Sequence, residues 1–225
     1  SRDPDHVRSI NYLSNLGFVL HLNGNSNEGE EYLKESMNVA KRIRGEDHPH
    51  TAMAMSSYAS FLFDQSKYEE SEELTKGVLQ IYLDSFGDDH PAIPVFYNNV
   101  GNTRNNLGDF EEALSYHQKA LERRIELYGD RHPEVAQSYA NMATTFSDMV
   151  RYPEALDYYN RALDIELEVY GESHPEPAFS YLAIGNVYKY MKQADDAERF
   201  YFMGYGILSD VLGKDHFETD YARNR

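Results

Sequence analysis

The sequence predicts an all-α protein built as a solenoid of antiparallel helix pairs. A short turn recurs with its glycine at positions 45, 87, 129, 171 and 213, so each step is 42 residues long. A constant period in this range, kept over five copies, is typical of a repeat array. Between the turns, apolar residues recur at the three- and four-residue spacing of amphipathic helices. Each repeat should therefore hold two helices.

The recurring turn explains where one helix stops and the next begins. The copy of the turn at residues 87–91 reads Gly87-Asp88-Asp89-His90-Pro91. A glycine that follows an apolar helical run can adopt the left-handed conformation that ends a helix. A proline is well placed at the first position of the next helix, where its missing N–H costs nothing. We expect the turn histidine to pack in the connector and to bond the start of the next helix.

The turns divide the chain into one domain of five repeats and the start of a sixth. The repeats occupy residues 6–47, 48–89, 90–131, 132–173 and 174–215, and residues 216–225 begin the next one. In the second repeat we expect helices at 50–64 and 68–85, with equivalents every 42 residues and no sheet. Ser66 and Glu69 have the spacing of a capping box for the second of these helices.

The third repeat resembles a tetratricopeptide repeat (TPR). Tyr97, Val100-Gly101, Gly108, Phe110, Ala113 and Ala120-Leu121 stand at its aromatic, Leu-Gly, Gly, aromatic, Ala and Ala-Leu positions. The 42-residue period and the Gly-x-x-His-Pro connector resemble the kinesin light chain class. Arg104 and His117 depart from the pattern, and Gly29 and Ser71 replace its first alanine in the first two repeats. The resemblance implies a right-handed superhelix whose first helices line a concave groove.

Composition excludes several function classes. The net charge of -17 argues against nucleic acid and anionic membrane surfaces as partners, since phosphate binding needs clustered Lys and Arg. The chain contains no cysteine, which rules out disulfides and thiolate metal sites. No apolar run is long enough to span a membrane and no signal peptide is visible. We expect a cytoplasmic protein, and a fragment of a longer one.

No constellation of side chains indicates an enzyme, a cofactor or a metal centre. Six histidines recur once per repeat, at positions 6, 48, 90, 132, 174 and 216. Neighbouring repeats hold equivalent atoms roughly 10 Å apart, whereas zinc ligands converge within about 2.1 Å of one ion. His21, His50 and His117 show no partner spacing. Nucleotide-binding and hydrolase motifs are absent from the sequence.

Asparagines concentrate on the face of the first helices that should line the groove. Asparagine is a poor helix former, but its amide offers both a donor and an acceptor to a peptide backbone. In TPR peptide binders, similarly placed asparagines clamp the ligand backbone. The predicted groove residues are Asn15, Ser56, Ser60, Asp64, Asn98, Asn99, Asn102, Asn105, Asn141, Thr144, Asp148, Asn186, Lys189 and Tyr190.

The charge of this face favours a neutral to basic ligand. Kinesin light chain grooves are basic and chaperone-binding TPRs use a Lys/Arg clamp, whereas this face offers one basic residue, Lys189, against the two acidic residues Asp64 and Asp148. We expect Asn99, Asn102, Asn141 and Asn186 to hold the backbone of an extended ligand, with Phe63 and Tyr190 in apolar contact.

The sequence therefore predicts a scaffold that binds a protein or peptide. A structural or self-assembling array, or a regulatory sensor attached to a signalling domain, remains the alternative. The last long helix is too apolar for a capping helix. We expect residues 216–225 to cover part of it and the rest to allow self-association through this C-terminal edge.

Overall fold

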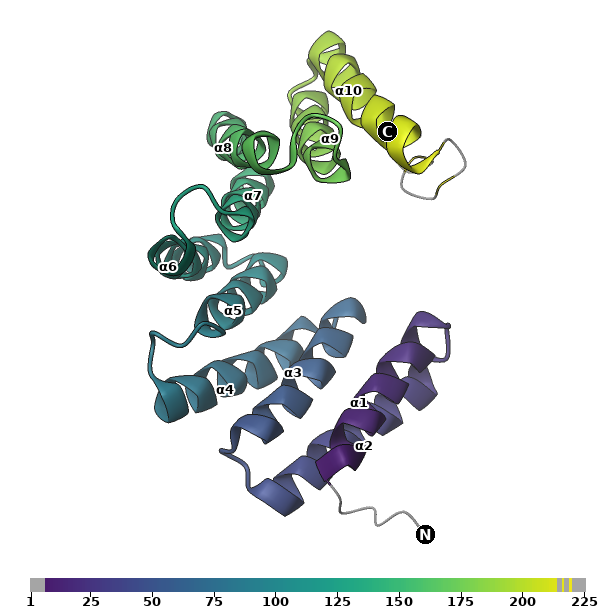
Figure 1. Cartoon of the computed structure of the whole chain (residues 1–225), viewed down its shortest axis with the longest axis vertical. Coiled ribbons are helices and arrows are strands. Elements are labelled where there is room, and N and C mark those ends of the chain that lie inside the picture. Colours follow the sequence, from purple (N-terminus) through teal and green to yellow (C-terminus); the bar gives the residue numbers. More distant parts are fainter. Residues whose placement is uncertain (1–6, 214–215, 217–218, 220–225) are drawn as a thin grey trace. The chain divides into compact units, whose positions relative to one another are not determined.

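The computed structural model describes residues 7–213, 216 and 219. Within this part of the chain it contains ten α-helices and no strand, as predicted (Figure 1). The helices are α1 (Val7–Leu22), α2 (Ser26–Arg44), α3 (Pro49–Asp64), α4 (Tyr68–Phe86), α5 (Ile93–Leu107), α6 (Phe110–Tyr128), α7 (Pro133–Asp148), α8 (Tyr152–Tyr170), α9 (Pro175–Tyr190) and α10 (Ala194–Leu212).

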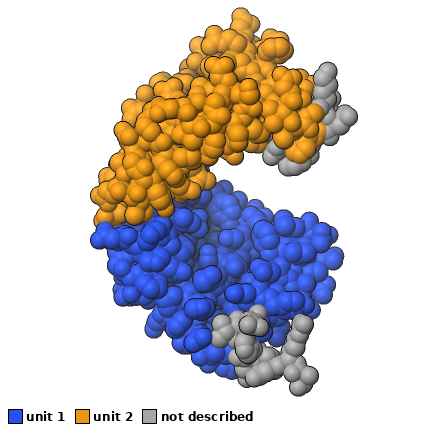
Figure 2. All heavy atoms as spheres, in the orientation of Figure 1, with its two compact units in different colours: residues 1–116 blue, residues 117–225 orange. Residues whose placement is uncertain are grey.

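The chain forms two compact units, residues 1–116 and 117–225, which divide within α6 (Figure 2). In unit 1, α1 packs on α2 and α3 packs on α4. In addition, α2 contacts α3 and α4 contacts α5. In unit 2, α7 packs on α8 and α9 on α10, and α8 contacts α9. Each of these pairs thus corresponds to one repeat, and α2, α4 and α8 also pack on the first helix of the following pair, as in a solenoid.

The connector histidines start the helices that follow them, which confirms their predicted role. His48, His132 and His174 each precede a helix-starting proline, and Nδ1 of each accepts the backbone N–H two residues on, at 3.0, 3.2 and 3.2 Å. Such side-chain acceptors satisfy one of the free N–H groups of a helix start. His90 makes the same bond to Ala92 N–H at 3.2 Å, although α5 begins three residues after it, at Ile93.

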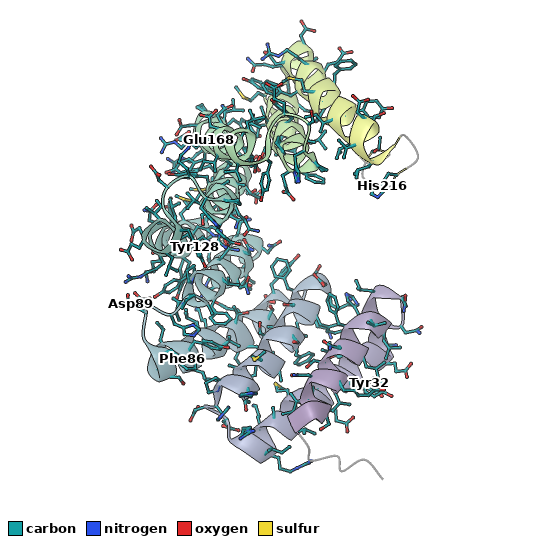
Figure 3. The ribbon with its side chains drawn as sticks, viewed as in Figure 1. Tyr32, Phe86, Asp89, Tyr128, Glu168 and His216 are labelled. Carbon is teal, nitrogen blue, oxygen red and sulfur yellow. The ribbon has the colours of Figure 1, made fainter. Side chains whose placement is uncertain are left out.

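Aromatic rings from the preceding helices stack on three of these histidines, His90, His132 and His174. Phe86 and Tyr128, labelled in Figure 3, end α4 and α6 and stack on His90 and His132, with ring centroids 4.6 Å apart in both pairs. The connector glycines adopt φ between 78 and 94°, with ψ between 156 and 173° where a helix cap is described. This region is essentially restricted to glycine, and it differs from the left-handed helical cap that the sequence suggested.

The loops inside the repeats correct one predicted cap. Ser66 has a φ of 57°, and α4 is preceded by Lys67, which makes no side-chain cap bond. The predicted capping box is wrong because Ser66 occupies the left-handed position of the loop. Gly24, Gly108, Val150 and Lys192 occupy the same position at 42-residue steps, with φ between 61 and 85°.

Small residues let the helices of a pair approach closely. A Cβ added to Gly29 would lie 2.6 Å from the carbonyl oxygen of Gly17, and one added to Gly185 would lie 2.6 Å from the ring of Tyr201. In the second repeat Ser71 donates to the carbonyl of Ala59 at 2.8 Å. Gly29 and Ser71, which depart from the alanine of the repeat pattern, therefore serve the same close contact.

Candidate functional site

Unit 1 has a pocket on the predicted groove face, between α3 and α5, with α4 behind it. Its volume is about 170 Å³. Five predicted groove residues line it, namely Ser56, Ser60, Asp64, Asn99 and Asn102. The helical spacing of these residues puts them on one side of α3 and α5, and the packing of both helices on α4 brings the two sides together.

The polar groups at the mouth of this pocket differ in what they bind. Asp64 Oδ2 lies 3.5 Å from Nε2 of His21, for which the sequence indicated no partner. Among the described residues, no side chain or backbone group hydrogen-bonds the side-chain amides of Asn99 and Asn102. Both asparagines are half-buried. Their side-chain amides are therefore partly exposed and can hydrogen-bond a ligand.

Unit 2 has a second pocket, of about 480 Å³, between α7 and α9 with α8 behind it. Asn141 and Thr144 are the predicted groove residues that line it. Thr144 Oγ1 lies 2.8 Å from the hydroxyl of Tyr159, which reaches up from α8. The hydroxyl of Tyr201 likewise donates to Asn186 Oδ1 at 2.9 Å from α10. Tyrosines of the second helices thus orient polar groups on the first helices.

Acidic side chains that the sequence analysis did not select also line the unit 2 pocket. They are Glu134, Glu166 and Glu176. Burial raises the pKa of Glu166, a hydrogen bond from Ser180 opposes this rise, and the charge of Glu176 adds to it. Glu134 is held by Arg124, whose Nη2 lies 2.9 Å from Glu134 Oε2. Three of the lining residues are therefore acidic, although Arg124 balances the charge of Glu134 and burial favours the neutral form of Glu166.

Comparing equivalent positions of the repeats in the sequence could have identified Arg124 and Glu166 as unusual charged residues. Arg124 and Glu166 stand at a position that Ala40 and Leu208 occupy in other repeats, and both of these apolar residues are fully buried. Charged residues are rarely buried unless they have partners. Arg124 is 2 % exposed and donates to the carbonyl of Glu134 and the hydroxyl of Ser138, at 2.9 and 2.8 Å.

The remaining predicted groove residues lie outside both pockets. Asn98 is buried at 6 % exposure, whereas Asn15, Asp148, Lys189 and Tyr190 are exposed. Tyr190 stacks on Tyr152, with ring centroids 6.3 Å apart. Asn105 and Asn186 are half-buried and line neither pocket.

Within the described part of the chain, no group of three or more His, Asp or Glu side chains is arranged to hold a metal ion. A search of the described helices for one long and apolar enough to cross a membrane finds none. The prediction of a helix over 216–225 falls mostly outside the described residues. Of that stretch, Thr219 is helical and its hydroxyl donates to the carbonyl of Leu208 at 3.1 Å.

Solved structures of other repeat proteins share this fold. Nearly identical TPR-like repeats described as a kinesin light chain of Podosopora anserina match with a TM-score of 0.77 and 17 % identity, covering 94 % of this chain and 99 % of that one. BtubC (BKLC) of P. vanneervenii matches with a TM-score of 0.77 and 22 % sequence identity, and the match covers 94 % of this chain and 84 % of that one. Aspartyl phosphate phosphatase F of Bacillus subtilis matches with a TM-score of 0.76 and 13 % sequence identity, and the match covers 96 % of this chain but only 55 % of that one.

Sequence comparison identifies the family, whereas these structural likenesses show the fold alone. No curated protein matches the chain. Family models of the tetratricopeptide repeat match residues 8–60, 93–166 and 148–208, and a second tetratricopeptide repeat model matches residues 51–92. These matches cover most of the five repeats, and the chain therefore belongs to the tetratricopeptide repeat family.

Proposed function

We propose that the chain is a protein-interaction module that binds an extended, neutral to basic segment of a partner on the groove face of its odd-numbered helices. The observation that carries the proposal is the pair of open amides of Asn99 and Asn102 beside the unit 1 pocket. An amide with a free donor and a free acceptor matches the alternating N–H and C=O groups of an extended peptide backbone. A merely solvated helix surface has no need of the four asparagines, Asn99, Asn102, Asn105 and Asn106, that α5 leaves partly or fully exposed.

The charge of both pockets supports a ligand without negative charge. Asp64 borders the unit 1 pocket, and Glu134, Glu166 and Glu176 line the unit 2 pocket. Like charge across an interface rejects a partner, and opposite charge speeds its association. The net charge of -17 extends this selection to long range at low salt.

The test starts from peptides selected against the intact chain from a random library. Asn99→Ala and Asn102→Ala each leave a backbone group of the ligand unpaired, which costs roughly 1–3 kcal/mol, or about five- to 150-fold in Kd. Gln80→Ala is the matched control, because Gln80 is exposed on α4 and its one hydrogen-bond partner among the described residues is Asp84 on the same helix. Titration calorimetry of basic and acidic versions of one peptide tests the charge. Unchanged affinity in both asparagine variants, or tighter binding of the acidic peptide, would exclude this site.

Self-association through α10 is the second candidate. Phe202, Met203 and Val211 on this helix are 74, 38 and 46 % exposed, and exposed apolar patches mark interaction surfaces. Light scattering over a range of concentrations should show a dimer that Phe202→Ser dissociates. A chain that stays monomeric at all concentrations rules this candidate out.

A further inference from the structure

The unit 1 pocket has an apolar floor beneath its polar mouth. Ala59, Val78 and Phe96 line it and are 4, 1 and 9 % exposed. They come from α3, α4 and α5, which Figure 1 shows following one another along unit 1. The floor therefore belongs to the packed interior of three helices rather than to a mobile loop.

The three hydroxyl groups in this floor are already committed to backbone carbonyls. Ser71 donates to Ala59, Thr75 donates to Ser71 and Thr103 donates to Asn99, at 2.8, 2.7 and 2.9 Å. Each hydroxyl has a single proton to donate. The floor consequently has no hydroxyl donor left for a carboxylate or carbonyl of a ligand, and such an acceptor placed there would lose its hydrogen bonds to water without replacement.

Thr75 makes the base of this pocket differ from that of its unit 2 equivalent. It precedes Tyr159 by 84 residues and Tyr201 by 126, which are two and three repeat lengths. Tyr159 lines the unit 2 pocket with its hydroxyl against Thr144 Oγ1, and the hydroxyl of Tyr201 donates to Asn186 Oδ1. Threonine lacks the phenol, and its hydroxyl turns back to the carbonyl of Ser71 on its own helix. The base of the unit 1 pocket is therefore free of the polar phenol group that Tyr159 contributes in unit 2.

We propose that this pocket receives one apolar side chain of the bound segment, that of leucine, isoleucine, methionine or phenylalanine, while Asn99 and Asn102 hold the backbone on either side. The inference rests on the proposed function and adds a sequence requirement to it. The volume of about 170 Å³ is close to that of the dry apolar cavity of roughly 150 Å³ that holds benzene. The acid Asp64 at the mouth adds a penalty for an acidic side chain.

The absence of cysteine from the chain allows a test that needs no peptide. Ser60→Cys places the sole thiol at the exposed mouth of the pocket. The variant is equilibrated with small disulfides that carry an isobutyl, benzyl, carboxylate or ammonium group, against a fixed excess of 2-mercaptoethanol, and intact mass reports the adducts. We expect the isobutyl and benzyl groups to be captured at least about tenfold more than the two charged groups, since each buries apolar surface.

Two control variants distinguish binding in the pocket from nonspecific binding of apolar groups to the protein surface. Thr75→Tyr, made in the Ser60→Cys chain, restores the ring and should abolish the apolar preference. Should the tyrosine variant unfold, Thr75→Leu serves instead, because Leu33 stands at this position in the first repeat. Thr144→Cys is the matched site in unit 2, where Tyr159 and three glutamates line the pocket, and it should show a weaker apolar preference than Ser60→Cys.

The outcomes distinguish this inference from the proposed function. Equal capture of apolar and charged groups by the Ser60→Cys chain, or an apolar preference that survives filling at Thr75, overturns the pocket proposal. The exchange involves no peptide, so an apolar preference can be found even when asparagine variants bind selected peptides normally. Conversely, selected peptides that depend on Asn99 but contain no apolar residue would support the groove and refute the pocket.

Discussion

His117 should make the folded chain sensitive to mild acid. The histidine is 1 % exposed in α6, and burial together with the nearby charge of Arg124 lowers its pKa to about 4. The unfolded chain binds a proton at this residue near its ordinary pKa of 6.5. Because the folded pKa is the lower one, the stabilisation is complete above about pH 6.5 and is lost as the pH falls through the window from about 6.5 to about 4.

The magnitude follows from the difference between the two pKa values. A difference of roughly 2.5, at ~1.36 kcal/mol for each pKa unit, corresponds to about 3 kcal/mol when the window has been crossed. A single domain is stabilised by only about 5–15 kcal/mol, so this one residue should account for a large part of its acid sensitivity.

The assay compares the parent chain with His117→Phe, which places an aromatic ring where Tyr159 and Tyr201 stand in later repeats. Urea unfolding followed by circular dichroism gives both free energies of unfolding between about pH 7.5 and about pH 4. The change in packing shifts the variant by a constant amount at all pH values. As the pH falls, the free energy of unfolding of the parent should decrease relative to that of the variant, by up to about 3 kcal/mol at the lowest pH. Parallel curves over this range would refute the buried, neutral histidine.

Two further substitutions test the backbone geometry by thermal unfolding. Val150 has a φ of 62° and is 66 % exposed, whereas Gly108 occupies the same loop position at 85°. Val150→Gly should raise stability by about 1 kcal/mol because it relieves a left-handed β-branched residue, and a lower Tm would contradict this. Gly29→Ala should destabilise by about 1–3 kcal/mol, since its Cβ would meet the Gly17 carbonyl. Its control, Gly206→Ala, meets no atom within 4 Å and should stabilise by about 0.5–1 kcal/mol; equal effects of both would disprove the close contact.

The repeat sequence predicted the helices well because their limits depend on local chemistry. The connectors that begin at Gly45, Gly87, Gly129 and Gly171 each place a glycine, a histidine and a proline within five residues, and these residues stop one helix and start the next with bonds that span only two to four residues. The one local prediction that failed, the capping box at Ser66, depended on a choice between two nearby backbone conformations. The loop length and the following helix settle that choice, and the side chain alone does not.

Helical spacing predicted which residues share one side of the first helices, but it did not predict the pockets between those helices. Helical spacing placed Ser60, Asn99 and Asn102 on one side, and the structure brings them around the unit 1 pocket. The same reasoning selected Asn98, which is buried, because a rotation of about 100° per residue separates it from Asn99 by little more than the width of the face.

The amino-acid sequence by itself determined the class of fold, the 42-residue period and the role of the connector histidines, since these follow from periodicity and from bonds between near neighbours. Only the tertiary structure decided that Thr75 lines a pocket, that His21 meets Asp64 and that Arg124 and Glu166 stand where other repeats place buried apolar residues. The physical reason is that a cavity or a desolvated charge depends on what neighbouring helices place opposite a side chain. That arrangement is a property of packing between repeats, which no single stretch of the chain contains.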